Sequence, residues 1–257
     1  MLKPCAKILL IVSMLSIGVS AARADEIASA QALFYQANAS YAEEKFDQAI
    51  AAYEEALKLD YESGPLYYNL ANAYFKQGIL GEAIVNYLRA QRLMPDDADL
   101  KANLAYAQSL IKGGRVTAQR HWLADQLLTL AGEFNLDKIT VLTVFLYVAA
   151  ALFTVLFIFF KRARRILGYF TAASLAALLI ATSLWGIQFY NTVVYKKAVI
   201  VVANAECKFE PFADATTFFM LSEGESVIVG PAKKEWFKIK RADAKQGWIK
   251  KTDIELL

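Results

Sequence analysis

The chain has 257 residues, of which 57% are hydrophobic, and it carries 28 Lys and Arg against 25 Asp and Glu, a net charge of +3. This balance lacks the basic excess that nucleic-acid binding requires, so the sequence excludes nucleic acid as a partner. The hydrophobic fraction is typical of a chain that lies partly in a membrane. The part of the chain outside the membrane would be long enough for two small soluble modules of about 60 to 90 residues each.

The first 24 residues are typical of a secretory leader. Lys3 and Lys7 precede an apolar stretch over residues 8–22, and the small residues Ala22 and Ala24 end the segment. This pattern predicts cleavage by signal peptidase after Ala24. An uncleaved leader would remain as an anchor with its N-terminus in the cytoplasm, and the downstream topology would be unchanged.

Residues 25–112 contain an internal repeat. Small and aromatic residues return after 34 residues: Ala49, Tyr53 and Ala56 are followed by Ala83, Tyr87 and Ala90. This period predicts units of two antiparallel helices, at about 30–63 and 64–97, with a capping helix at 98–112. The expected helices are 28–44, 47–59, 65–77, 81–93 and 97–112. So short a stack normally needs self-association or a partner for stability.

The stretch Leu66–Gly78, together with Pro95, resembles the tetratricopeptide repeat family. The resemblance implies an all-α solenoid whose first helices line a concave face. Four asparagines fall on that face in the repeat register: Asn38, Asn69, Asn72 and Asn103. Asparagine offers both a donor and an acceptor, which suits the backbone of a partner segment; the alternative is that these side chains only face solvent.

The charge of this region indicates the kind of partner. Residues 25–112 hold seven Lys and Arg against thirteen Asp and Glu, a net −6. A basic or neutral partner surface is therefore expected.

The following segment, 113–138, has an apolar stripe that includes Trp122, Leu127 and Phe134. It predicts either an amphipathic helix in the membrane interface or a further helix packed on the stack.

Two apolar runs follow, at 139–160 and 166–190, and neither contains Asp, Glu, Lys or Arg. As helices they are about 33 to 38 Å long, enough to cross a hydrocarbon core of about 30 Å. We therefore expect a two-helix transmembrane hairpin in contact with membrane lipid. The loop 161–165 contains four cations: Lys161, Arg162, Arg164 and Arg165. Short cationic loops stay in the cytoplasm, so the modules on both sides of the hairpin are expected outside it.

Residues 197–257 change to an alternating pattern rich in β-branched and aromatic residues. Five short strands are expected, at 198–202, 217–221, 226–229, 236–239 and 247–249, and they predict a small all-β barrel. The order Leu221-x-Glu223-Gly224, Trp236-Phe237-Lys238-Ile239 and Gly247-Trp248-Ile249 resembles the bacterial SH3 family. The resemblance implies a binding groove at Trp236, whose ring is otherwise part of the core, and we expect Trp248 in the core.

Chemistry-bearing residues are sparse. Cys207 is the only cysteine after the leader, so an internal disulfide is excluded; it is either an inert strand residue or a thiol for an intermolecular bond or redox sensing. The single histidine, His121, has no metal-ligating neighbour in the sequence. No nucleophile with its base and no phosphate loop is found, so neither an enzyme nor a bound cofactor or metal is expected.

The fold class predicted is therefore a multidomain membrane protein with a leader, a helical repeat stack, a two-pass hairpin and a terminal SH3-like barrel. This order resembles the BatE proteins of bacterial aerotolerance operons. The resemblance implies a non-catalytic inner-membrane scaffold with periplasmic modules, which works with membrane-anchored von Willebrand A domain proteins against oxidative stress. The alternative is a cell-wall receptor whose SH3-like domain binds peptidoglycan.

Overall fold

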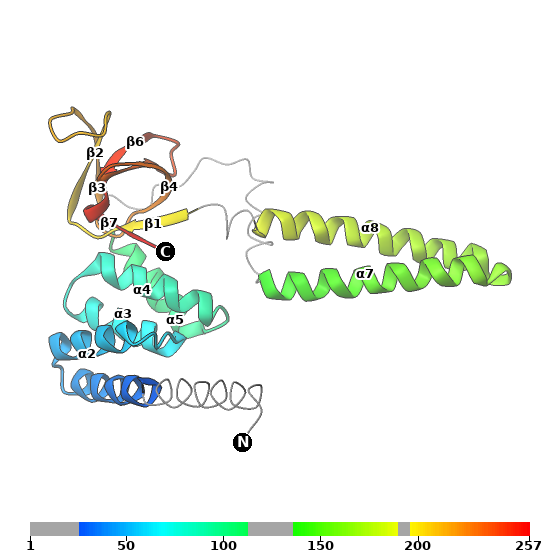
Figure 1. Ribbon diagram of the computed structural model, residues 1–257, viewed down its shortest axis with the longest axis horizontal. Helices are drawn as coiled ribbons and strands as arrows, with labels where there is room; N and C mark the ends of the chain where they lie inside the picture. The colour runs from blue at the N-terminus through cyan, green and yellow to red at the C-terminus, as the bar shows by residue number, and fades with distance from the viewer. Residues whose placement is uncertain (1–25, 113–135, 190–195) are drawn as a thin grey trace, which may run out of the picture.

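The computed structural model describes residues 26–112, 136–189 and 196–257 (Figure 1). They form a helical module, a long helical hairpin and a C-terminal β module. The predicted leader and nearly all of the predicted juxtamembrane segment, including His121, lie outside the described residues.

The helical module follows the predicted order of helices closely. Residues 26–42 are helical, and four helices follow: α2 (Phe46–Lys58), α3 (Gly64–Lys76), α4 (Leu80–Leu93) and α5 (Ala98–Ser109). Side-chain caps set two of the starts, since Ser63 Oγ accepts from Leu66 N at 3.3 Å and Asp97 Oδ1 accepts from Leu100 N at 2.8 Å. Every boundary lies within a few residues of its predicted position.

The two repeat units turn in the same way with different residues. Gly78, between α3 and α4, has a φ of 78°, and Glu44, 34 residues earlier, has a φ of 59°. Glycine adopts this left-handed conformation without steric cost, whereas another residue there is strained by about 1 kcal/mol or more. The first unit therefore makes the same turn as the second at a higher conformational cost.

The core of the helical module is built from the residues that recur at 34. The repeating alanines and tyrosines are all buried: Ala49, Tyr53, Ala56, Ala83, Tyr87 and Ala90. Alanine lets adjacent helices approach closely, and each tyrosine fills the space between them. The repeat therefore specifies the packing of the module and not only its helices.

The helical hairpin consists of α7 (Leu136–Phe159), the short 3-10 helix η1 (Lys161–Ala163) and α8 (Arg164–Phe189). Both long helices are long and apolar enough to cross a membrane. Small residues make their contact, with Ala150, Ser174 and Ala181 at most 9% exposed, and most of the other side chains face outward.

The tip of the hairpin is tighter than the predicted five-residue loop. Arg164 and Arg165 are the first residues of α8 and not part of a loop, while Lys161 and Arg162 lie in η1. The guanidinium of Arg164 lies 4.8 Å from the ring centre of Phe157, which holds this arginine against the preceding helix. All four cations still lie at the tip and are exposed.

The β module is a single antiparallel sheet in the order β3-β2-β6-β5-β4-β1-β7. Its strands are β1 (Lys196–Ile200), β2 (Asn204–Lys208), β3 (Thr217–Ser222), β4 (Ser226–Lys233), β5 (Trp236–Lys240), β6 (Gln246–Lys250) and β7 (Ile254–Leu256), with a 3-10 helix, η3 (Lys251–Asp253), before the last. Its core contains Ile200, Leu221, Ile239 and Ile249.

The prediction of five strands was wrong, because the described residues form seven. The sequence Asn-Ala-Glu-Cys-Lys of β2 alternates correctly, with Ala205 and Cys207 buried, but it lacks the β-branched and aromatic residues that mark a strand. The strand β7 has only three residues and is held by pairing with β1. Both strands depend on their neighbours more than on local propensity.

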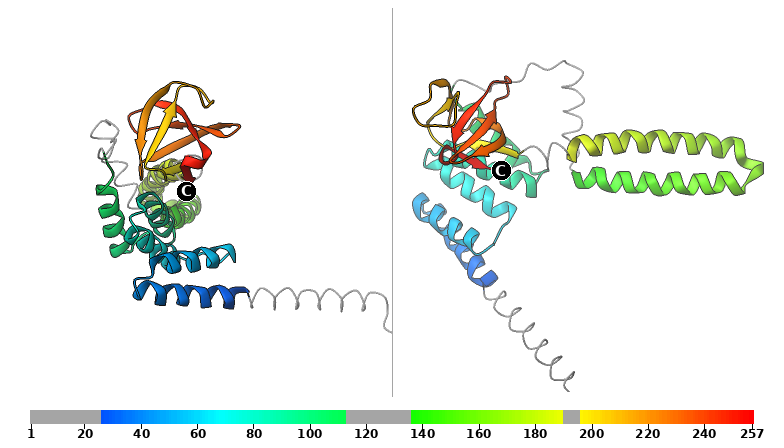
Figure 2. Two further views of the ribbon diagram at one scale, coloured as in Figure 1. Left: turned by 90° about the vertical axis from the view of Figure 1, so that its left-hand side faces the viewer. Right: turned by 45° about the horizontal axis from the view of Figure 1, so that its top comes forward.

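The β module packs on the helical module, and the hairpin extends away from them (Figures 1 and 2). Strand β1 lies against α4, and its Val199 is part of the same buried cluster as the helical core. Val201 and Leu257 pack against that cluster as well. The β module of the same chain therefore supplies contacts that the short stack was expected to need from self-association or a partner.

Candidate partner-binding surfaces

The four predicted asparagines come together in two pairs along the first helices of successive units. Asn69 Nδ2 donates to Asn38 Oδ1 at 2.9 Å, which joins α3 to the helix over residues 26–42. Asn103 Nδ2 lies 3.4 Å from Asn72 Oδ1, which joins α5 to α3. We call the surface that these four residues share the ladder face.

Each pair is also tied to the second helix of its unit. Tyr53 OH donates to Asn38 Oδ1, and Tyr87 OH donates to Asn72 Oδ1, both at 2.5 Å. Burial raises the pKa of Tyr53 to about 12 and also raises the pKa of Tyr87, so both hydroxyls stay protonated donors at ordinary pH. The asparagines thus have a structural role that the sequence did not predict.

The ladder face also carries exposed aromatic rings. Tyr35 is 69% exposed and Tyr106 is 60% exposed, and the Tyr106 ring lies 5.8 Å from that of Phe75. In the repeat register these rings share the face with the asparagines, and Tyr68 OH accepts from Asn103 Nδ2 at 2.8 Å. Amide groups and aromatic rings on one face suit an extended segment with apolar side chains.

A second arrangement joins α4 to the β module. Arg89 Nη2 contacts Glu255 Oε1 at 2.6 Å and Leu256 O at 3.2 Å, and the backbone N of Gly81 donates to Glu223 Oε1 at 2.7 Å. The Arg89 side chain is 27% exposed, so its ion pair is partly shielded from water. These contacts fix the β module at two points along α4.

Two glycines allow this close approach. A Cβ on Gly81 would lie 2.7 Å from Ile200 O and 2.8 Å from Val201 Cα, and both are backbone atoms that cannot rotate away. A Cβ on Gly224 would lie 2.7 Å from Ile84 Cδ1. This interface could not be predicted from the sequence, because a glycine carries no signal of a neighbour more than a hundred residues away.

Carboxylates crowd the same interface. Burial raises the pKa of Glu82, the Glu255 carboxylate adds to this, and Arg89 opposes it. The carboxylates of Glu54 and Glu223 raise it further. A raised carboxyl pKa means that the folded state holds this proton more tightly than the unfolded state does, and that contribution to stability is lost as the pH rises through the raised value.

Replacing Glu82 with glutamine is therefore expected to stabilise the protein at neutral pH. The melting temperature of Glu82→Gln should exceed that of the wild type at neutral pH, and the difference should shrink toward pH 4, where the wild-type carboxyl is protonated. Thermal unfolding of the detergent-solubilised protein at several pH values measures this. Glu55→Gln, at an exposed ion pair with Lys58, is the control and should give little pH-dependent difference. An equal profile for both variants would contradict the prediction.

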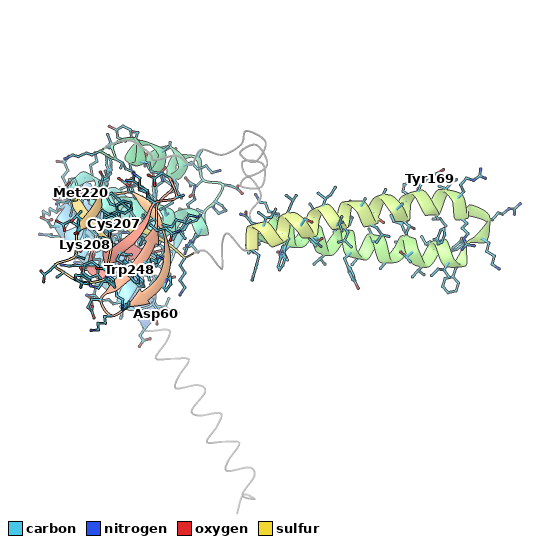
Figure 3. The ribbon with its side chains drawn as sticks, turned by 90° about the horizontal axis from the view of Figure 1, so that it is seen from above. Asp60, Tyr169, Cys207, Lys208, Met220 and Trp248 are labelled. Atoms are coloured by element: carbon cyan, nitrogen blue, oxygen red, sulfur yellow. The ribbon has the colours of Figure 1, made fainter. Side chains whose placement is uncertain are left out.

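The two tryptophans of the β module lie in different environments, and Trp236 fits the core alternative left open for it. Trp236 is 6% exposed, so its ring offers a ligand little surface, and the groove assigned to it remains a prediction. Trp248 was expected in the core, which is wrong: Gly247 and Ile249 face inward on β6, and Trp248 between them faces outward and is half-buried. Its register partner on β2 is Lys208, and Figure 3 labels both residues on the β module.

Cys207 is buried against Gly247, where a Cβ would collide with its Sγ. Burial raises the pKa of the thiol to about 12, so the reactive thiolate is scarcely populated at neutral pH. This environment favours the inert strand residue over the redox sensor. In the described ranges, no group of three or more His, Cys, Asp or Glu side chains is arranged to hold a metal ion.

Paired antiparallel helices that recur at 34 residues, with buried alanine and tyrosine at fixed points, are the features of a tetratricopeptide-type repeat region in the helical module. Comparison with family models agrees with this: residues 37–78 match the model described as TPR repeat, and residues 65–97 match the model described as Tetratricopeptide repeat. No match was found among curated proteins. Tetratricopeptide repeats are protein-interaction scaffolds, so protein partners are implied.

Proposed function

We propose that this protein is a non-enzymatic adaptor anchored in the bacterial inner membrane. The matched repeats support a role in protein binding, and α7 and α8 have the length and composition of membrane spans. The cations at the tip, Lys161 to Arg165, favour a cytoplasmic tip. The helical and β modules then lie together on the periplasmic side.

The ladder face is the proposed partner-binding surface. The observation that carries this proposal is its combination of two exposed rings, Tyr35 and Tyr106, with the paired asparagines. Apolar side chains of a partner would pack on the rings. Amide donors and acceptors that the asparagines do not use between themselves would form hydrogen bonds with the partner's backbone. A neutral or weakly basic segment fits best, because the rest of the module is acidic.

Exposed rings provide a cleaner test than the asparagines, whose removal would also weaken the module. Tyr106→Ala is expected to reduce recovery of partner proteins from solubilised membranes at least about tenfold, a loss of about 1.4 kcal/mol. Leu93→Ala, at an exposed residue at the end of α4, is the control. Unchanged recovery with Tyr106→Ala and Tyr35→Ala together would remove the ladder face from the proposal.

The order of modules, which resembles BatE proteins, supports a more specific role. We propose that the partners are membrane-anchored von Willebrand A domain proteins and that the complex serves aerotolerance under oxidative stress. Mass spectrometry of cross-linked membranes is expected to recover such a protein. The cell-wall receptor alternative predicts instead that the purified protein pellets with insoluble peptidoglycan and that Trp236→Ala abolishes this.

The topology is tested separately from the partners. A phosphatase that is active only in the periplasm should be active when fused after Leu257 and inactive when inserted after Ala163. A reporter that is active only in the cytoplasm should give the reverse result. Neutralising the four tip cations should lower the fraction with this orientation. Cytoplasmic activity after Leu257 would contradict the arrangement.

A further inference from the structure

The outer face of the β module combines lysines with exposed apolar side chains. Because side chains alternate along a strand, the buried residues Cys207, Ile239 and Ile249 place their neighbours on the opposite face. We define the Trp248 face by the outward residues of β2, β3, β5 and β6: Glu206, Lys208, Phe218, Met220, Lys238, Lys240, Trp248 and Lys250.

Strand register places Trp248 at the centre of this face. It lies opposite Lys208 on β2 and opposite Lys238 on β5, so a lysine flanks the indole on each side. The next pair joins Lys250 to Trp236. In the row of Trp248, lysine and indole therefore alternate across β2, β6 and β5, whereas Trp236 in the next row is buried.

Exposed apolar side chains also lie at the edge of the sheet, on the far side of β2 from Trp248. Phe218 is 40% exposed and Met220 is 47% exposed on β3, and Phe209, 55% exposed, lies 4.3 Å from Phe218 between ring centres. Strand β3 is an edge strand, so one side of its backbone is not paired within the sheet. Exposed apolar residues beside such an edge are typical of a docking site for an extended segment.

The charge of the face is positive and largely uncompensated. The side chain of Lys208 is only 12% exposed, and its Nζ donates to Ala213 O and lies 3.4 Å from Glu206, so the uncompensated cations of the face are the other three lysines. Within the described ranges, Lys238, Lys240 and Lys250 form no ion pair. The acidic helical module of the same chain packs on β1, β7 and the turn between β3 and β4, and within the described ranges its carboxylates form no ion pair with these lysines.

We propose that the Trp248 face binds an extended acidic segment of a partner protein. Carboxylates of the segment pair with the lysines, an apolar side chain rests on Trp248 and Phe218, and the backbone lies along β3. This proposal rests on the proposed adaptor function. It adds a second docking surface, which prefers an acidic segment where the ladder face prefers a neutral or weakly basic one. A neutral or weakly basic segment on one surface and an acidic one on the other give the adaptor two distinguishable partners.

The test uses the full-length protein in detergent micelles and a fluorescein-labelled peptide of alternating Glu and Val. The expected result is an increase in fluorescence anisotropy that weakens as salt is added, with no comparable binding of the matched Lys-Val peptide. Lys238→Glu and Trp248→Ala should each weaken binding about tenfold or more. Lys197→Glu, an exposed lysine on β1, is the matched control and should have little effect.

Equal binding of both peptides, or an equal loss with Lys197→Glu and Lys238→Glu, would overturn the proposal. The proposal would also be overturned if the Glu-Val peptide did not bind while anionic lipid vesicles or peptidoglycan did, and if that binding were weakened by Lys238→Glu. Lys238→Glu keeps the test valid if Trp248→Ala fails to fold. Tyr106→Ala should leave peptide binding unchanged, so failure of the ladder face and failure of the Trp248 face give different results.

Discussion

Replacing Tyr87 with alanine is expected to lower the free energy of unfolding of the helical module by about 3 to 5 kcal/mol. The side chain is 2% exposed, and its ring lies 6.0 Å from that of Tyr68. The substitution leaves a cavity between α3 and α4 and removes the donor to Asn72. A domain is commonly stable by only about 5 to 15 kcal/mol, so much of this short stack's stability would be lost.

Denaturant unfolding followed by circular dichroism measures this effect. Tyr87→Phe keeps the ring and removes the hydroxyl, so it separates the contribution of packing from that of the hydrogen bond. It should lower the free energy of unfolding by only about 1 kcal/mol. Tyr35→Ala is the matched control, with the same change at a side chain that is 69% exposed, and should change the free energy by about 0.5 kcal/mol or less. Similar losses for Tyr87→Ala and Tyr35→Ala would contradict the packing described above.

Replacing Gly81 with alanine is expected to separate the β module from the helical module. The added methyl would meet the backbone of Ile200 and Val201 at under 3 Å, so the two modules must move apart. Overpacking of this kind costs about 1 to 3 kcal/mol, and it outweighs the gain of about 1 kcal/mol that alanine brings to a helix. Separation also breaks the bond from Gly81 N to Glu223 and weakens the pair of Arg89 with Glu255.

Hydrogen exchange measured by mass spectrometry is the appropriate readout. Peptides from α4, β1 and β7 should exchange faster in Gly81→Ala, while peptides from β5 and β6 should change little because the sheet itself remains folded. Gly186→Ala is the matched control, since a Cβ on this helical glycine meets nothing within 4 Å. Unchanged protection in β1 and β7 would show that the interface tolerates the methyl.

Together these predictions assign two roles to α4. One side of the helix carries Tyr87 and completes the asparagine pair of the ladder face, and the other carries Gly81 and Arg89 and holds the β module. Substitutions on the two sides are therefore expected to have different signatures. Tyr87→Ala destabilises the helical module itself, whereas Gly81→Ala releases the β module, which stays folded.

The sequence by itself determined the features that arise from local periodicity. The 34-residue repeat specified the helical pairs and their buried alanines and tyrosines, and the charge-free runs specified two long apolar helices. The alternation of the C-terminal region predicted a small all-β module. Each of these patterns can be read from a sequence because it is a regular spacing along the chain: two for a strand, about 3.6 for a helix and 34 for the repeat.

The tertiary structure decided which faces meet. It paired Asn38 with Asn69 across two helices, buried Trp236 while turning Trp248 outward, and brought Glu223 and Glu255 to α4. The sequence could place the asparagines on one face but not their hydrogen-bond partners, because a partner depends on the distance between helices. Contacts between distant segments follow from packing and strand register, which local propensity does not encode.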